Sequence, residues 1–136
     1  MGCFEALFAG QKHLIITLPL PPAALHAHTA GNWRSKAAPT RAYRLEAALV
    51  AQQAMRKEGD SYPYDSAELS VDFYWPNLRR RDTLNAVQSC KGAIDGLSDA
   101  GLISDDDWQH LTIGHIRSHL DRENPRVCLT VDVTEV

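Results

Sequence analysis

Residues 67–75, AELSVDFYW, constrain the fold of this chain more than any other stretch. The apolar residues at positions 69, 71, 73 and 75 alternate with a polar or amphipathic set, Glu68, Ser70, Asp72 and Tyr74. A period of two predicts a β-strand that buries one of its faces. Such a strand needs other elements to cover that face, so we expect a layered domain around a sheet.

Further elements are predicted before this strand. Residues 13–18, HLIITL, are rich in β-branched residues and are followed by prolines at positions 19, 21 and 22, which predicts a strand that feeds a rigid turn. Residues 23–39 show no period, which predicts a long surface loop. Apolar residues then recur at steps of three and four, which predicts a helix over Thr40–Lys57 with Thr40 as its N-cap.

The second half of the chain predicts one helix and two strands. Apolar residues at positions 84, 87, 94 and 97 mark the helix, with Asp82 or Thr83 as its cap and Gly101 at its end. Residues 111–120 and 126–133 are strand candidates that can join as a hairpin around 121–125. We therefore expect an α/β (α+β) fold, a small mixed β-sheet with two main helices in a single domain.

Composition places the chain among ordinary globular proteins. Its 136 residues can bury a core without disulfides or a structural metal. We interpret residues 1–12 as a loose N-terminal leader and 13–136 as the domain. No run approaches the roughly 18 apolar residues of a membrane span, so no membrane association is expected. Three widely spaced cysteines without a CxxC motif predict free thiols and a cytoplasmic location.

The formal net charge of −3 conceals two differently charged halves. Residues 1–60 hold seven Lys and Arg against four Asp and Glu, whereas residues 61–136 hold seven against thirteen. The first half carries a basic arm made up of Arg34, Lys36, Arg41 and Arg44. Divalent cations would offset part of the acidic excess in the second half. The weak overall positive field argues against tight non-specific binding to DNA.

Residues 79–109 bring positive charge and carboxylates together. Three arginines, Arg79, Arg80 and Arg81, lead directly into Asp82, and Lys91 follows on the second predicted helix. Arginine matches phosphate in a bidentate geometry, and carboxylates are the ligands that hard divalent cations prefer. This combination is typical of a metal-dependent enzyme that acts on nucleic acid.

Each of these residues also has a purely structural interpretation. Aspartate is a common helix N-cap, and Asp82 stands where the second predicted helix begins. Lys91 can form an i,i+4 ion pair with Asp95, which contributes only about 0.2–0.5 kcal/mol on a solvated surface. The arginines can form a solvated basic turn. Capping and metal binding are compatible, because a carboxylate has two oxygens.

An acidic triplet, Asp105–Asp107, closes the segment. Adjacent carboxylates repel one another, which a folded protein tolerates on a solvated turn or around a cation. Trp108 follows directly, and we expect this bulky side chain to anchor the turn. His115 and His119 form an HxxxH pair, a spacing that we expect to align the rings only on a helix. Their segment is predicted to be a strand, so no zinc site is expected there.

The order of these motifs resembles that of the RusA-type Holliday-junction resolvases. The shared features are Arg-Arg-Arg-Asp82, Asn85, Lys91, Asp95-Gly96-Leu97, Gly101 and Asp106-Asp107-Trp108-Gln109, together with the proline-rich residues 18–22 and the stretches 32–36 and 41–44. The resemblance spans residues 13–133 and rests on order and spacing rather than on any single motif.

The resemblance implies a homodimeric endonuclease that makes paired nicks in four-way DNA junctions with Mg²⁺, or with Mn²⁺. It implies that Asp82, Asp106 and Asp107 hold the metal ion and that Lys91 neutralises charge in the transition state. Counting from Lys91 instead of from Gln109 would select Asp105 and Asp106 as the acidic pair. The arginines at 79–81 and the basic arm would bind the DNA backbone.

The chain departs from the family pattern at Leu84. The family reads Asp-x-Asp-Asn where this chain reads Asp82-Thr83-Leu84-Asn85, and leucine cannot ligate Mg²⁺. Three additional residues also precede Lys91, which on one continuous helix would leave the lysine near the same face. Three hypotheses follow: an active junction resolvase, a catalytically impaired junction-binding protein of the same fold, and a small cytoplasmic α/β domain with an acidic turn. The third predicts no structure-selective binding to DNA.

Overall fold

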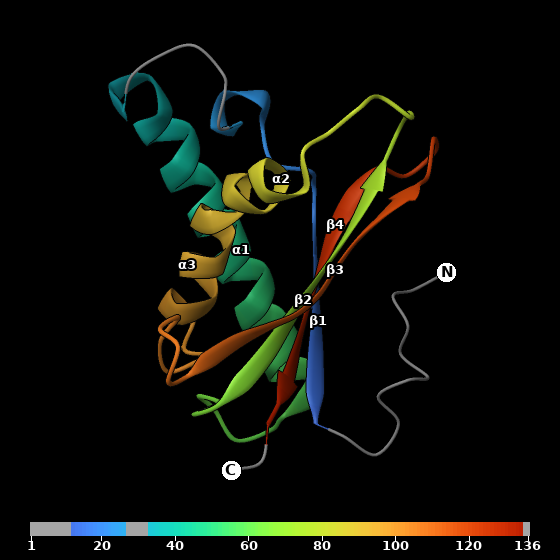
Figure 1. Cartoon of the computed structure of the whole chain (residues 1–136). Coiled ribbons are helices and arrows are strands. Elements are labelled where there is room, and N and C mark those ends of the chain that lie inside the picture. Colours follow the sequence, from blue (N-terminus) through green and yellow to red (C-terminus); the bar gives the residue numbers. More distant parts are fainter. Residues whose placement is uncertain (1–11, 27–32, 135–136) are drawn as a thin grey trace.

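The computed structural model describes residues 12–26 and 33–134, which form a four-stranded sheet with helices on one face (Figure 1). The strands are β1 (His13–Leu18), β2 (Ala67–Trp75), β3 (Leu111–Leu120) and β4 (Arg126–Val133). The helices are a 3₁₀ turn, η2 (Ala23–Leu25), and α1 (Trp33–Glu58), α2 (Thr83–Ser89) and α3 (Lys91–Asp99). The predicted fold class is confirmed. The predicted leader lies outside the described residues, apart from Lys12.

The strands lie in the order β1-β4-β2-β3. β4 pairs antiparallel with both β1 and β2, and β2 pairs parallel with β3. Residues 127–132 of β4 are all buried, as a central strand requires, whereas most of β3 is exposed at the sheet edge. The predicted hairpin between the last two strands is therefore wrong, because β2 lies between them.

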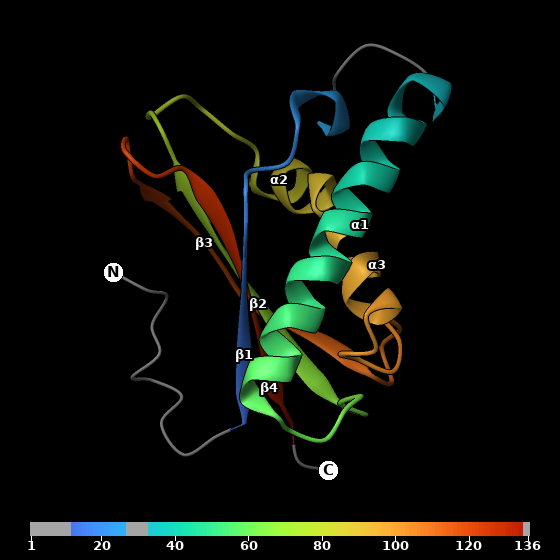
Figure 2. The same ribbon diagram turned by 180° about the vertical axis from the view of Figure 1, so that it is seen from behind.

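The hydrophobic core fills the space between the sheet and the helices. Alternate residues of three strands point into it, namely Leu14, Ile16, Leu18, Leu69, Val71, Phe73, Val127, Leu129 and Val131. From the helices, α1 contributes Tyr43, Ala47 and Ala51, and α3 contributes Ala93, Ile94 and Leu97. Figure 2 shows from behind that the helices share one side of the sheet. We call the opposite side of the sheet the open face.

Helix α1 begins at Trp33 rather than at the predicted Thr40. The predicted loop is therefore wrong for residues 23–25 and 33–39, while residues 27–32 lie outside the described residues. Pro39 lies inside the helix, although proline is disfavoured there. The Thr40 hydroxyl does not cap the helix but donates to the Lys36 carbonyl, at 2.7 Å. Within the described ranges, no helix is long and apolar enough to cross a membrane.

The second predicted helix is divided at Cys90 into α2 and α3. Cys90 has φ −90° and ψ 0°, so the helix axis does not continue through it. Leu84 consequently does not share a face with Ile94, which is buried, and Leu84 itself is 75% exposed. Cys90 is a free thiol, as predicted, and burial raises its pKa to about 12. Cys3 lies outside the described residues.

Gly101 ends α3, as predicted from the sequence. Its φ of 83° lies in the left-handed region that favours glycine. Its N–H donates to the Ser98 carbonyl (3.0 Å), and the Leu102 N–H donates to the Leu97 carbonyl (3.1 Å). These two bonds form a Schellman motif, in which Leu97 and Leu102 are both buried. The motif directs the chain into the acidic triplet.

Candidate functional site

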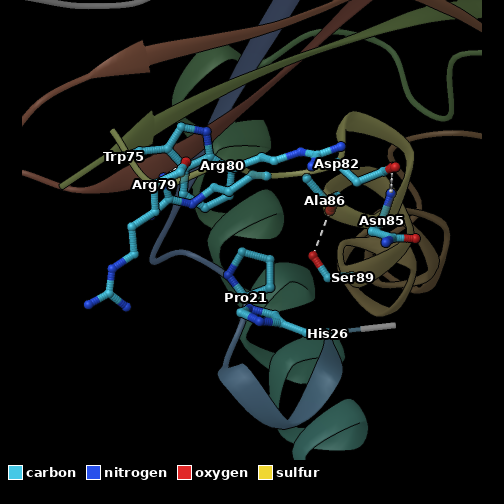
Figure 3. A pocket seen from close by; sticks show the side chains of 10 residues that line it. Pro21, His26, Trp75, Arg79, Arg80, Asp82, Asn85, Ala86 and Ser89 are labelled. Carbon is cyan, nitrogen blue, oxygen red and sulfur yellow. Dashed lines mark hydrogen bonds between the residues drawn. The ribbon is translucent and has the colours of Figure 1, made fainter. Parts of the chain in front are cut away.

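A pocket of about 310 Å³ lies beside the start of α2 (Figure 3). Three parts of the chain meet there: the turn after β1, the end of β2 with the turn that follows it, and α2 with its N-cap. They contribute Pro21, His26, Trp75, Arg79, Arg80, Arg81, Asp82, Asn85, Ala86 and Ser89. The fold thus brings the proline-rich turn and the predicted arginine cluster to one hollow, with Asp82 on its border.

Asp82 is the N-cap of α2. Its backbone is extended, with φ −77° and ψ 125°, and its Oδ1 accepts a hydrogen bond from the Asn85 N–H at 3.0 Å. The predicted capping role is therefore confirmed. The bond uses one oxygen of an exposed carboxylate, so the metal-binding role remains a prediction.

The three arginines are not equivalent. Arg81 turns back on its own loop, where Nη2 donates to Asn77 Oδ1 (2.8 Å) and the guanidinium lies 4.2 Å above the centre of the Trp75 ring. Burial lowers the pKa of Arg81, and the charge of Arg79 lowers it further. Arg79 and Arg80 are exposed, and Figure 3 shows Arg79 pointing away from the other side chains. Arg81 therefore stabilises the turn, and Arg79 and Arg80 remain the candidates for phosphate contacts.

Lys91 lies at the start of α3 between two carboxylates. Its Nζ is 2.6 Å from Asp95 Oδ1 and also contacts Asp106 Oδ2. The hydrogen bond to Asp106, followed by that to Asp95, raises the pKa of Lys91, and the bond from Lys91 lowers the pKa of Asp106. The predicted Lys91–Asp95 ion pair is confirmed. Lys91 is a positioned cation at neutral pH and is unsuited to act as a base.

The three carboxylates of the acidic triplet each contact a different group. Asp105 Oδ1 accepts from the Asp106 N–H (2.7 Å), and Asp106 contacts Lys91. Asp107 Oδ1 is 2.6 Å from His110 Nδ1, a contact that lowers the pKa of Asp107 and raises that of His110. Trp108 is 82% exposed, so the expectation that it anchors the turn is wrong. The Asp107–His110 contact closes the turn instead.

The structure separates the residues predicted to hold a metal ion. Asp82 borders the pocket, Asp106 contacts Lys91, and Asp107 contacts His110. Across residues 12–26 and 33–134, no three His, Cys, Asp or Glu side chains form a group that could hold a metal ion. Carboxylate oxygens are the donors that Mg²⁺ prefers, so the chemistry of the predicted ligands fits. Their placement in this structure does not assemble a site.

The basic arm lies along the first half of α1. Arg44 holds Asp99, with 2.8 Å between Nη2 and Oδ1, and its Nη1 is 3.9 Å from Asp95 Oδ2. Lys36 Nζ donates to the His26 carbonyl at 3.3 Å. Arg34 and Arg41 are exposed. Arg44 thus links α1 to α3 and to the carboxylate that holds Lys91, while its contact with DNA stays a prediction.

Sequence reasoning missed a cluster on the open face. Asp72 is only 1% exposed, and its two oxygens contact His115 Nε2 (2.9 Å) and His119 Nε2 (2.8 Å). The expectation that only a helix aligns these two rings is wrong, because residues four apart also point to one side of a strand. A charged residue in the middle of a buried strand, with two histidines at an even spacing elsewhere, was the available signal.

No protein-family model and no curated protein matches this chain. The fold defines a small α+β domain with a basic pocket at one end of its sheet. Any assignment of function therefore depends on the geometry of that pocket and on the order of the motifs around it.

Proposed function

We propose that this chain is a metal-dependent, structure-selective endodeoxyribonuclease that resolves four-way DNA junctions by paired phosphodiester hydrolysis. The observation that carries the proposal is the shared pocket of Arg79, Arg80 and Asp82. Exposed guanidinium groups can hold phosphate oxygens in a bidentate geometry. A carboxylate beside them can hold a hard cation against the same phosphate.

The proposed role of each residue follows from its charge. Arg79 and Arg80 would bind the DNA backbone, and Arg81 would keep their turn in place. Lys91, held as a cation by its two carboxylates, would stabilise negative charge that develops on the phosphate. Asp82, Asp106 and Asp107 would hold Mg²⁺ or Mn²⁺, which supplies an acidified water and neutralises phosphate charge. Because Asp82 lies apart from the other two, they must approach one another when DNA and metal bind.

The proposal includes a homodimer in the cytoplasm. A four-way junction presents symmetry-related strands, and a two-fold dimer would present one pocket to each of two such strands. Branched DNA is the expected partner, and no membrane partner is proposed.

A second candidate is a junction-binding protein of the same fold with impaired catalysis. Leu84 favours it, because this exposed hydrocarbon side chain stands two residues after Asp82 and provides no oxygen for a metal ion. The separation of Asp82 from Asp106 also favours it.

Cleavage of a labelled four-way junction and of a matched linear duplex tests both candidates. Each substrate is incubated with Mg²⁺ or with a chelator, using the native protein and Asp82→Asn. The nuclease proposal expects nicks in the junction alone, which require the metal ion and disappear in Asp82→Asn. Tight junction binding without nicks would establish the second candidate. Equal cleavage and equal binding of the junction and the linear duplex would contradict both candidate functions.

A further inference from the structure

The pocket beside α2 has an apolar part as well as a charged one. Figure 3 shows Pro21 and His26 on one side of the hollow and Trp75 on the other. Pro21 is buried, and Ala86 lines the pocket from α2. Contacts with phosphate alone would need none of these apolar groups. The pocket can therefore hold an apolar or aromatic group beside the phosphate that its exposed arginines are proposed to bind.

Arg81 is the outer layer of a stack that begins in the core. The ring of Phe73, a buried residue, lies 5.0 Å from the Trp75 ring at an interplanar angle of 10°, and the Arg81 guanidinium lies 4.2 Å above the centre of Trp75. Hydrogen bonds of 2.8–3.1 Å to Asn77 and to the Arg79 carbonyl hold this guanidinium in place. Because Arg81 also lines the pocket, it offers a flat and fixed surface there. Nucleobases stack on arginine planes as they do on aromatic rings.

The size of the pocket suits a single nucleotide and excludes a duplex. Its volume of about 310 Å³ is at the lower end of the roughly 300–1,000 Å³ that small-ligand pockets span. A base in duplex DNA is stacked and paired, so it can enter such a pocket only by leaving the helix. The cost of leaving is smallest for a base that is already unpaired. The pocket should therefore favour DNA that carries unpaired bases.

Two uncharged polar groups of α2 also line the pocket. The Asn85 side-chain amide makes no hydrogen bond with the described residues, because only its backbone N–H is bound, to Asp82. The Ser89 hydroxyl donates to the Ala86 carbonyl at 2.6 Å and can still accept a hydrogen bond. An amide presents both a donor and an acceptor, as the edge of an unpaired base does.

From these features we infer that the pocket binds one unpaired nucleotide of a DNA strand. The base packs against Arg81 and Pro21, and the Asn85 amide contacts its edge. The two exposed arginines hold the phosphate of the same nucleotide beside Asp82. The inference rests on the proposed function, because it takes DNA as the substrate. It gives the selectivity for branched DNA a physical origin, since a linear duplex has no unpaired base to offer.

Fluorescence anisotropy with three labelled DNAs tests the inference, in the presence of a chelator so that no cleavage occurs. The DNAs are a linear duplex, the same duplex with one additional unpaired nucleotide, and that bulged duplex with the base of the unpaired nucleotide removed. We expect the bulged duplex to bind more tightly than either of the others by about 5- to 150-fold, the range for stacking of one base. Equal affinity for the bulged and the abasic DNA would overturn the inference, because the backbone alone would then account for binding.

A substitution that fills the pocket gives a second test. Ala86→Leu adds bulk to the lining without changing any charge, and leucine is a good helix former. It should remove most of the preference for the bulged DNA over the abasic DNA. Gln88→Leu is the matched control, because Gln88 is an exposed residue of the same helix outside the pocket lining, and it should keep the preference. Equal effects of the two substitutions would contradict the inference.

Asn85→Ala keeps the test valid if Ala86→Leu does not fold. It removes the amide but not the N–H that Asp82 binds, and it should weaken binding of the bulged DNA much more than binding of the abasic DNA. Competition with deoxyadenosine monophosphate identifies the source of the nucleotide. Displacement of the bulged DNA by an equal concentration of this free nucleotide would overturn a DNA strand as the occupant. A protein that prefers the bulged DNA but never cleaves a junction with Mg²⁺ would contradict the nuclease proposal and leave this inference standing.

Discussion

Asp82 has a structural role and a proposed chemical role, and two substitutions can separate them. Asparagine also caps helices well, whereas alanine cannot accept the hydrogen bond from the Asn85 N–H. We expect Asp82→Ala to lower the free energy of unfolding by about 1 kcal/mol and Asp82→Asn to change it by less than about 0.5 kcal/mol. Urea denaturation measures both. Equal stability of the two variants would show that the cap contributes nothing.

The Asp107–His110 contact predicts a titration that NMR can follow. Removing the carboxylate in Asp107→Asn should return the pKa of His110 toward its ordinary value, because the Asp107 hydrogen bond is the main cause of its rise. Asp105 contributes least to that rise, so Asp105→Asn should lower the pKa of His110 by much less. A larger effect of Asp105→Asn would contradict the described geometry.

The same pair links the stability of the turn to pH. The raised pKa of His110 gives a contribution that is complete below the unfolded pKa of about 6.5 and is lost as pH rises through the folded value. The lowered pKa of Asp107 gives a contribution that is present above its unfolded pKa of about 3.9 and is lost as pH falls through the folded value. The pair should therefore stabilise the turn most between about pH 4 and about pH 6.5.

The role of a residue was predictable from the sequence where it depends on near neighbours in the chain, and it was not predictable where it depends on tertiary packing. The Asp82 cap, the Lys91–Asp95 pair and the Gly101 helix end depend on neighbours within four residues, so sequence spacing was sufficient to find them. The exposure of Leu84 and Trp108 depends on how α2 and the acidic turn pack against the rest of the chain. No local pattern contains that information.

At the scale of elements, α1 and α3 meet closely at Gly96. A Cβ at this position would lie 2.4 Å from the Arg44 carbonyl oxygen and 3.0 Å from Ala47 Cβ. Gly96→Ala should therefore destabilise the protein by about 1–3 kcal/mol, because a backbone must move. At Gly92 a Cβ would lie at an ordinary 3.4 Å from Thr40, so Gly92→Ala should be neutral or stabilising by up to about 1 kcal/mol. Thermal unfolding of the two variants compares them, and a tolerated Gly96→Ala would contradict this packing.

Strands were easier to locate than to pair. The alternation in 67–75 and the β-branched run in 13–18 predicted β2 and β1, since both signals are local. The hairpin prediction failed because sheet position follows burial on both faces, which places β4 in the interior and β3 at the edge. The start of α1 was missed because residues 33–39 show no helical period and include Pro39, a residue type that is disfavoured inside a helix.

At the scale of the whole molecule, DNA binding should depend strongly on salt. Each phosphate contact that is lost reduces the slope of log affinity against log salt concentration by about 1. We expect Arg80→Gln to weaken junction binding and to reduce the slope by that amount, as measured by fluorescence anisotropy across a salt series. Arg56→Gln, an exposed arginine in the last turn of α1, should leave both unchanged. Equal effects of the two substitutions would exclude the pocket as the DNA contact.

The candidate site was predicted in content but not in arrangement. Its arginines, Asp82 and Lys91 were recognised from residue type and order, and the pocket does gather the arginines around Asp82. The predicted helix is divided at Cys90 into α2, which Asp82 caps, and α3, which begins at Lys91, and the spacing of apolar residues does not reveal this break. The cluster of Asp72, His115 and His119 on the open face is assembled by the pairing of β2 with β3, which is a property of the complete sheet.

The strand order has a consequence for how the chain folds during synthesis. Of the four described strands β4 is the last to leave the ribosome, yet it is the strand that joins β1 to β2. A nascent chain that already contains β1, β2 and β3 can pair β2 with β3, but β1 has no partner strand until β4 emerges. At roughly 5–20 residues per second, β1 therefore waits for several seconds with its apolar side uncovered by a sheet. The sheet is completed only after β4 has emerged, so the strand order leaves β1 without a partner strand while β2 and β3 can already pair.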